Sequence, residues 1–156
     1  MQLSGETEIA APRQRVWDVL TDPHQVTGCV PGDLKIEVID ERNLRVTAQV
    51  GNGFFQTTVT VEIELTDLDA PERATATATG SVMASPVIAT GSLELEELGP
   101  NVTRTAWTAD VTLGGMLVGF AGMVQAPAQG GVDRTIECLK AKLEAEADAG
   151  AAVASE

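Results

Sequence analysis

Alternation between apolar and polar residues dominates the middle of the chain. From Asp33 to Leu113 the period is two almost throughout, and it is clearest in residues 54–65, "FFQTTVTVEIEL". There, Phe, Thr, Val, Ile and Leu side chains share one face, while Gln, Thr and Glu side chains share the other. Such one-sided alternation is typical of an antiparallel sheet with one face in water. Turn residues divide this region into six strands, and the alternating residues 1–11 predict a seventh at the start of the chain.

Three helices are predicted around these strands. Pro12 stands at a helix-start position, and apolar residues on one side of residues 12–20 predict a short helix. Asp22 can cap a second short helix that ends at Gly28. The third helix, near the end of the chain, is indicated by an apolar stripe with helical spacing: Val132, Ile136, Leu139 and Leu143.

The segment that leads into this last helix is uncharged from Val111 to Val132. It is long enough to cross a bilayer, but it contains two glutamines, a proline and six glycines, so a membrane-spanning helix is not predicted. A proline inside a helix costs about 3 kcal/mol. Pro127 therefore predicts a bend or a break of the helix between Ala126 and Gly131.

The order of elements is thus one strand, two short helices, six strands and a long helix. A sheet with one face in water needs a cover on its other face, and the last helix is the only large candidate. We therefore predict an α+β fold of the helix-grip type, in which a curved, seven-stranded antiparallel sheet wraps around the C-terminal helix. Residues 1–146 form a single domain in this prediction, and residues 147–156 form a flexible, acidic and alanine-rich tail.

The net charge of the chain narrows the range of partners. Ten Lys and Arg residues against 23 Asp and Glu residues give a formal net charge of -13, which repels nucleic acid and anionic lipid. We expect no nucleic-acid partner and at most peripheral contact with a membrane. The first residues show no basic-then-apolar signal pattern, and the two cysteines are interpreted as reduced thiols. These two observations predict a cytoplasmic protein.

The only histidine, His24, lies five positions before Cys29 in the stretch "LTDPHQVTGCVPG". A zinc site needs four ligands, or three and a water molecule, and no carboxylate at ligand spacing completes this pair. We therefore interpret the stretch as a turn shaped by glycine and proline rather than as a metal or catalytic site. No paired carboxylates, Ser–His–Asp set or phosphate-binding glycine loop stands out elsewhere, so no catalytic residue and no metal ligand is predicted.

The opening of the chain carries several short motifs in a fixed order: "LSGE" at 3–6, "AP" at 11–12, Trp17, "DP" at 22–23 and "CVPG" at 29–32. In this order they resemble the G-subunit family of carbon monoxide dehydrogenase, which is related to START-like and polyketide cyclase-type proteins. Weaker similarities follow at "VTVEIELTDLDAPE" and "TLGGML", so that the resemblance covers residues 3–143. The family often carries a membrane-associating tail, which the acidic, alanine-rich end of this chain does not match.

The resemblance implies a function as well as a fold. It implies a noncatalytic accessory protein of a molybdenum-containing carbon monoxide dehydrogenase or a similar hydroxylase. It also implies an apolar cavity that holds a lipophilic molecule such as a quinone or a lipid, with no intrinsic cofactor.

Small residues are the feature of the sequence that fits such a cavity. In residues 73–80, "RATATATG", alanines share one face and threonines the other, so either face is built of small side chains. Because close packing is the rule in proteins, small walls favour a closely approaching helix or space for a guest. The methionine- and glycine-rich segment 116–124 is a candidate for the opposite wall. The candidate ligand contacts are Trp17, Phe55, Met83, Trp107, Met116, Leu117, Phe120 and Met123.

Two other functions are compatible with the same fold. A polyketide cyclase or aromatase needs polar groups that converge in the cavity, usually Tyr, His or Arg. This chain has no tyrosine, and its one histidine lies in the predicted turn. A protein-interaction module needs no cavity at all. The presence of a cavity and the polarity of its lining therefore separate the three alternatives.

Overall fold

The computed structural model describes residues 1–30, 34–52, 55–82 and 84–154, with the backbone alone at 50–52, 55–56 and 149–154. Its strands are β1 (Gln2–Ile9), β2 (Leu34–Val38), β3 (Asn43–Asn52), β4 (Phe55–Asp69), β5 (Arg73–Val82), β6 (Ser85–Gly99) and β7 (Val102–Leu113). Its helices are α1 (Arg13–Leu20), α2 (Pro23–Gly28), the 3-10 helix η1 (Gly115–Phe120) and α3 (Ala121–Ala154). The predicted order of elements is confirmed.

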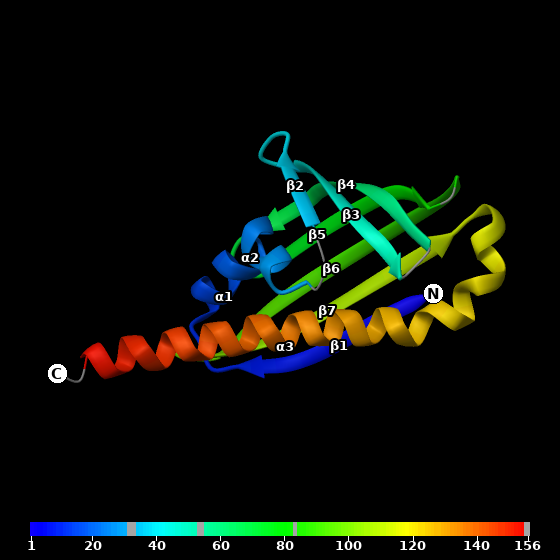
Figure 1. Cartoon of the computed structure of the whole chain (residues 1–156). Coiled ribbons are helices and arrows are strands. Elements are labelled where there is room, and N and C mark those ends of the chain that lie inside the picture. The colour runs from blue at the N-terminus through cyan, green and yellow to red at the C-terminus, as the bar shows by residue number, and fades with distance from the viewer. Residues whose placement is uncertain (31–33, 53–54, 83, 155–156) are drawn as a thin grey trace.

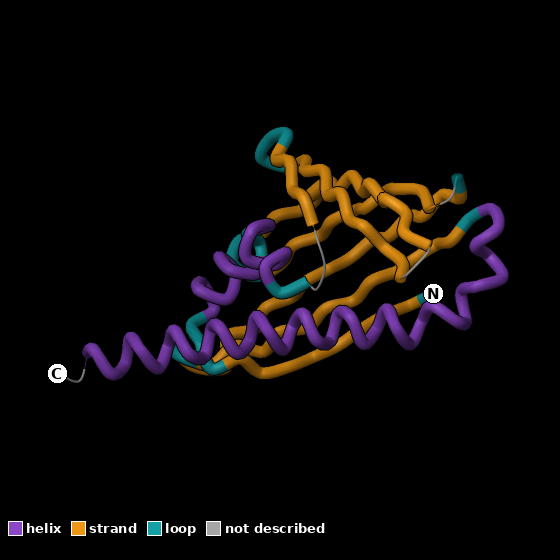
Figure 2. Tube along the Cα trace, in the orientation of Figure 1, coloured by secondary structure: helices purple, strands orange, loops and turns teal. Residues whose placement is uncertain are grey.

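All seven strands form one antiparallel sheet in the order β1-β7-β6-β5-β4-β3-β2. Strands β2 to β7 pair with their neighbours in sequence, while β1 joins the far edge beside β7. Figure 1 shows the sheet curving over α3, and Figure 2 shows the helices gathered on one side of the strands. The predicted α+β helix-grip fold, with a curved sheet around the C-terminal helix, is confirmed.

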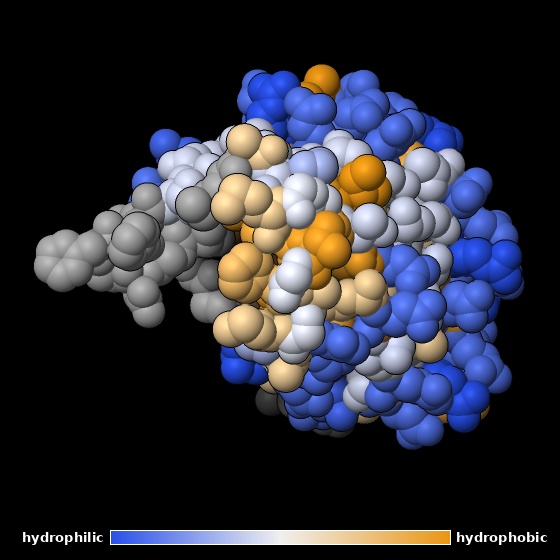
Figure 3. Space-filling view, turned by 90° about the vertical axis from the view of Figure 1, so that its right-hand side faces the viewer, coloured by the Kyte–Doolittle hydropathy of each residue, from blue (hydrophilic) through white to orange (hydrophobic). Residues whose placement is uncertain are grey.

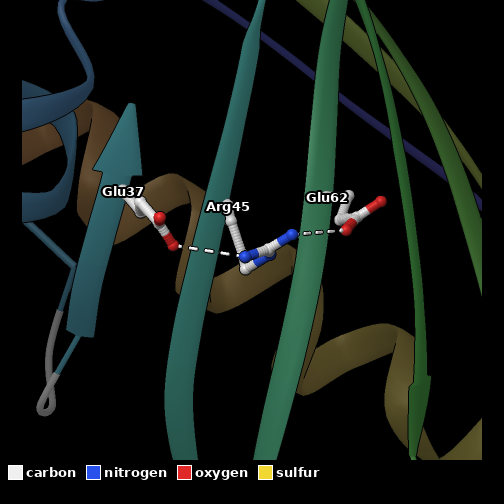
Figure 4. Close-up of polar contacts among 3 residues, drawn as sticks. All are labelled: Glu37, Arg45 and Glu62. Atoms are coloured by element: carbon white, nitrogen blue, oxygen red, sulfur yellow. Dashed lines mark hydrogen bonds and ion pairs between the residues drawn. The ribbon is translucent and has the colours of Figure 1, made fainter. Parts of the chain in front are cut away.

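The convex face of the sheet carries charged residues that are joined across strands. Arg45 of β3 lies between Glu37 of β2 and Glu62 of β4, at 3.2 Å from a carboxylate oxygen of each (Figure 4). Arg104 of β7 bridges carboxylates of β1 and β6 at 3.1 Å in the same way. Exposed pairs of this kind contribute little stability. Their charge nevertheless identifies this face as the one in water, and the side chains that alternate with them face α3.

The core lies at the end of the sheet where α1 packs. Its buried side chains include Ile9, Val16, Trp17, Leu139 and Leu143. The last two belong to the predicted apolar stripe of α3, whereas Ile136, one turn earlier on the same stripe, is only partly buried. Helix α3 is therefore packed closely at this end of the sheet and more loosely towards its middle.

The predicted break between residues 126 and 131 is wrong, because α3 passes through Pro127 as one helix (Figure 1). The change of helix type comes earlier, between η1 and α3. Pro127 removes only one helical hydrogen bond, the one to the carbonyl of Met123. Two turns of α3 around the proline are also held by the edge strand. Gln129 exchanges two hydrogen bonds with the backbone of Ser4, at 2.8 and 3.2 Å.

The last helix extends into the segment that the sequence assigned to a tail. Helix α3 continues to Ala154, so residues 147–154 are helical. Alanine has the highest helix propensity of all residues, and this segment is rich in it. Its composition therefore favours continuation of the helix.

The two cysteines are joined to each other. Cys29, directly after α2, and Cys138, within α3, form a disulfide with their Cα atoms 5.7 Å apart. A disulfide needs a Cα separation of about 4.4–6.8 Å. The interpretation of both residues as reduced thiols is therefore wrong. The partners lie 109 positions apart, and no local sequence pattern shows a contact at that distance.

Three stretches of the chain without charged side chains meet at one end of the molecule. These stretches contain no Asp, Glu, Lys, Arg or His: residues 46–61, 74–93 and 111–132. The antiparallel topology brings them together, because the ends of β3, β5 and β7 and the starts of β4, β6 and η1 lie at the same end of the sheet. Figure 3 views this end and shows apolar side chains gathered on it. Met116 (82% exposed) and Met123 (73%) are the most exposed of them. We call this surface the uncharged end.

Candidate ligand cavity

A row of small residues crosses the middle of the concave face. Ala76 of β5 lies opposite Gly91 of β6, and Gly91 lies opposite Ala109 of β7. Ala78 and Ala89 form the next pair along the strands. Side chains with one carbon or none cannot reach across to α3. This small-residue row therefore leaves space between the sheet and the helix.

That space is a cavity of about 400 Å³ between the sheet, the short helices and α3. A second hollow of about 520 Å³ adjoins it along α3. The residues that line both are Leu20, Val26, Leu93, Val132 and Ile136. Ligand sites in proteins usually measure about 300–1,000 Å³, so the cavity has the size of a small-molecule site.

The lining of the cavity is chemically simple. Among the described residues, no ionisable side chain lines either hollow. Thr75, Ser92 and Thr108 border the cavity through their backbone, because they alternate along the strands with Ala76, Gly91 and Ala109, which face it. The hydroxyls of Thr21 and Thr27, which also belong to the lining, donate to the backbone carbonyls of Trp17 and Pro23. Hydroxyls donate and accept hydrogen bonds but are poor acids and bases near neutral pH. The cavity is therefore built to hold an apolar, uncharged molecule rather than to move protons.

Of the predicted contacts, Trp107 lies in the cavity lining. It is 9% exposed and stands opposite Gly5 of the edge strand β1. A Cβ atom at Gly5 would lie 2.5 Å from the indole nitrogen of Trp107, so the indole lies directly over this glycine. The glycine of the "LSGE" motif thus makes room for the tryptophan that borders the cavity.

The predicted contacts in the methionine-rich segment lie away from the cavity. The residues that line the cavity do not include Met116, Leu117, Phe120 or Met123. The turn before η1 explains this placement, because Gly115 has a φ of +57° and the buried Ser85 hydroxyl accepts a hydrogen bond from the N–H of Met116 at 3.2 Å. This turn directs η1 beyond the end of the sheet. The predicted guest position between the sheet and segment 116–124 therefore does not coincide with the cavity.

The remaining predicted contacts are Trp17, Phe55 and Met83. Trp17 is buried in the core on α1 and is not a lining residue. The side chain of Phe55 and the whole of Met83 lie outside the described residues.

Sequence reasoning did not single out most of the residues that line the cavity. Val132 and Ile136 were visible as the first half of the apolar stripe, and Leu65 as part of an apolar strand face. The signal that could have identified them is the small-residue row. A stripe residue above that row faces space, whereas a stripe residue above large side chains packs in the core. Recognising this requires the strand pairing, which periodicity alone does not supply.

His24 and Cys29, in the predicted turn, are not among the residues that line the cavity. His24 is exposed on α2, and its backbone N–H donates to the Asp22 carboxylate at 3.0 Å, as the predicted helix cap requires. Cys29 is bonded to Cys138. Within the described ranges, no group of three or more His, Cys, Asp or Glu side chains could hold a metal ion. In the same part of the chain, no helix has the length and apolarity needed to cross a bilayer.

Solved structures share this fold. A conserved protein from Geobacillus kaustophilus is 21% identical, with a TM-score of 0.80 over 92% of this chain and 95% of that chain. The Zhui aromatase/cyclase from Streptomyces sp. R1128 is 17% identical, with a TM-score of 0.68 over 92% and 93%. A START superfamily protein from Mycobacterium smegmatis is 13% identical, with a TM-score of 0.69 over 92% and 97%. At these identities the similarity shows a shared, START-like fold alone.

The sequence itself identifies the family. No curated protein matches the chain. The family model for the G subunit of carbon monoxide dehydrogenase (CoxG) matches residues 5–144. This span runs from β1 into α3 and includes the strands, the short helices and the residues that line the cavity. The resemblance inferred from the opening motifs is confirmed, and the chain belongs to the CoxG family of carbon monoxide dehydrogenase.

Proposed function

We propose that this protein is a noncatalytic carrier that holds a lipophilic molecule, such as a quinone or a lipid, between the sheet and α3. The observation that carries the proposal is the cavity of about 400 Å³ over the small-residue row, with no ionisable side chain among its described lining residues. Burial of apolar surface contributes about 25 cal/mol per Å² before the costs of association. A cavity of this kind favours an apolar guest over water.

The described lining, which contains no ionisable side chain, favours a neutral guest. A quinone carries no charge, so it needs no ionised partner in the lining. A fatty-acid carboxylate would find no cationic side chain among the described lining residues, and a buried charge without a partner is costly. Neutral quinones and neutral lipids are therefore the preferred class.

We propose further that the guest serves a partner oxidoreductase of the molybdenum-containing carbon monoxide dehydrogenase type. Membership of the CoxG family supports this accessory role. We also propose that any contact with a membrane is peripheral and made through the uncharged end. The net charge of -13 repels anionic surfaces, and this end is the part of the molecule that lacks that charge.

A cyclase-like enzyme is the second candidate, because one structural neighbour is an aromatase/cyclase. Such chemistry needs side chains that transfer protons within the cavity. The described lining contains no ionisable side chain, and His24 is exposed on α2. These observations favour the carrier. The presence of the cavity also favours the carrier over an interaction module, because an interaction module needs no cavity.

Fluorescence tests the proposed carrier function. The chain has two tryptophans, and Trp107 lines the cavity while Trp17 lies in the core. In a Trp17→Phe variant, titration with ubiquinone-1 should quench the fluorescence of Trp107 to saturation. In the matched Trp107→Phe variant, the quenching of Trp17 should be much weaker, because that indole is not in the lining.

Solvent extraction of the purified protein, followed by mass spectrometry, would identify the natural guest. Absence of saturable quenching in Trp17→Phe, together with no copurified lipophilic molecule, would contradict the carrier function. Turnover of a polyketide substrate without such binding would favour the cyclase.

A further inference from the structure

The disulfide between Cys29 and Cys138 lies at the border of the cavity. Cys29 follows α2, and its neighbours Val26 and Val30 both line the hollow along α3. Ile136 and Leu139, beside Cys138 on α3, line the same hollow. The disulfide therefore fastens one wall of the ligand site to another.

Few other interactions hold these two walls together. Helix α2 contains no fully buried residue. Its side-chain hydrogen bonds are local, from Thr27 to the Pro23 carbonyl at 2.9 Å and from the His24 N–H to Asp22 at 3.0 Å. Among the described residues, no hydrogen bond or ion pair joins α2 to α3. Apart from partial apolar packing of Val26 against the core, the disulfide is the connection between the two helices.

The disulfide is also not the only source of core packing. Small domains that cannot build a sufficient core depend on disulfides, but this chain of 156 residues buries side chains from both sheet and helices. Both cysteines are half-buried rather than fully enclosed. A half-buried disulfide at the edge of a ligand site has a position from which its reduction can alter the site.

We propose that Cys29 and Cys138 form a redox switch that controls access to the cavity. A dithiol reductant attacks the disulfide, passes through a mixed disulfide and leaves as its own cyclic disulfide. Two electrons and two protons move from the reductant to the two cysteine sulfurs, and the bond between α2 and α3 is broken. Helix α2 then moves away from α3, which opens the cavity beside Val26. The role of this opening in guest exchange rests on the carrier function proposed above.

Hydrogen exchange of the full chain tests the switch without any ligand. After reduction with dithiothreitol, amide exchange in residues 23–30 should become at least about tenfold faster, while exchange in β5 and β6 stays unchanged. Reoxidation should restore the slow rate. The Cys29→Ser/Cys138→Ser variant should show the fast rate with or without reductant. Equal exchange of residues 23–30 in oxidised and reduced protein would overturn the proposal. So would two thiols that stay free after treatment with oxidised glutathione.

Release of ubiquinone-1 supplies the second readout. Its transfer from the Trp17→Phe variant to detergent micelles, followed by Trp107 fluorescence, should be at least about tenfold faster after reduction. Equal release rates with altered exchange of α2 would overturn control of the cavity by the disulfide. If ubiquinone-1 binds in neither redox state, the carrier function fails, and the hydrogen-exchange result alone decides the switch.

Discussion

Two buried threonines of β7 differ by one hydrogen bond. The Thr103 hydroxyl donates to the Ala11 carbonyl at 2.8 Å, whereas the Thr105 hydroxyl has no partner among the described residues. Thr103→Val should lower the free energy of unfolding by about 1–3 kcal/mol, because the buried Ala11 carbonyl loses its donor. Thr105→Val should leave that free energy unchanged or raise it by up to about 1 kcal/mol, because it removes an unsatisfied hydroxyl.

Urea unfolding of the two variants beside the wild type measures this difference. Each variant is the control for the other, because both replace a fully buried threonine on the same strand face. Equal losses of stability would show that the hydrogen bond to Ala11 is not what distinguishes the two positions.

The small-residue row can be tested by filling it. Ala76→Leu places three further carbons over the cavity floor and should weaken binding of ubiquinone-1 by about tenfold or more, because overpacking costs on the order of 1–3 kcal/mol when a guest is present. In the free protein the added side chain occupies empty space, so the melting temperature should change little.

Thr77→Leu is the matched control for this variant. It enlarges the adjacent residue of β5 on the opposite face of the sheet, where Thr77 borders Glu62 and Glu64 rather than the cavity. Its affinity for ubiquinone-1 should equal that of the wild type. Equal affinity of Ala76→Leu and Thr77→Leu would place the guest somewhere other than over the row.

At the scale of elements, one ion pair fastens the far end of α3 to α1. Arg15 donates two hydrogen bonds to the Glu146 carboxylate, at 3.0 Å from Nε and 2.6 Å from Nη2. The hydrogen bond from Arg15 lowers the pKa of Glu146 below its ordinary value of 4.5. A lowered pKa in the folded state means that the pair stabilises the fold above the ordinary pKa. That contribution is lost as the pH falls through the lowered pKa.

Melting temperatures of the wild type and Glu146→Gln should therefore differ by a constant amount near neutral pH. The difference should shrink as the pH falls below about 4.5, because the wild-type carboxylate becomes protonated there. A difference that persists at the lowest pH would show that Glu146 acts through something other than its charge.

The elements that follow from local patterns were predictable. Each strand has its own period of two, so the seven strands and the identity of the convex face needed no knowledge of the rest of the chain. The apolar stripe ending at Leu139 and Leu143 likewise predicted the covered face of α3. The prediction of a break at Pro127 was wrong, because it considered only the local free-energy cost of a proline in a helix. Hydrogen bonds between Gln129 and Ser4, residues 125 positions apart, help to offset that cost.

The candidate site was less predictable than the fold, because it depends on the strand register, which decides which residues of neighbouring strands lie side by side. Ala76, Gly91 and Ala109 are individually ordinary, and only the strand register makes them one floor. The exposed methionines, Met116 and Met123, were predicted to face the cavity and lie outside it. An apolar segment in sequence does not reveal whether it covers the sheet or passes its end, and the turn at Gly115 decides this.

At the scale of the whole molecule, the disulfide reduces the conformational entropy of the unfolded chain. It connects residues 109 positions apart, and the chain-entropy model assigns about 4.7 kcal/mol to closing a loop of roughly 100 residues. Reduction should therefore lower the free energy of unfolding by up to about that amount. Urea unfolding with and without dithiothreitol measures the change. The Cys29→Ser/Cys138→Ser variant should match the reduced protein, and an unchanged urea midpoint after reduction would contradict this account.

The distribution of charge has a consequence for orientation. All 23 Asp and Glu residues lie outside the three stretches that meet at the uncharged end, so the molecule has an electric dipole moment along its long axis. Helix α3 adds to it, because its N-terminus, the positive end of the helix dipole, lies near the uncharged end and its C-terminus points away (Figure 1). Near any negatively charged surface, within a Debye length of about 8–10 Å, this dipole exerts a torque. The molecule then rotates before contact, so that Met116 and its neighbours arrive first and the acidic remainder stays farthest from the surface.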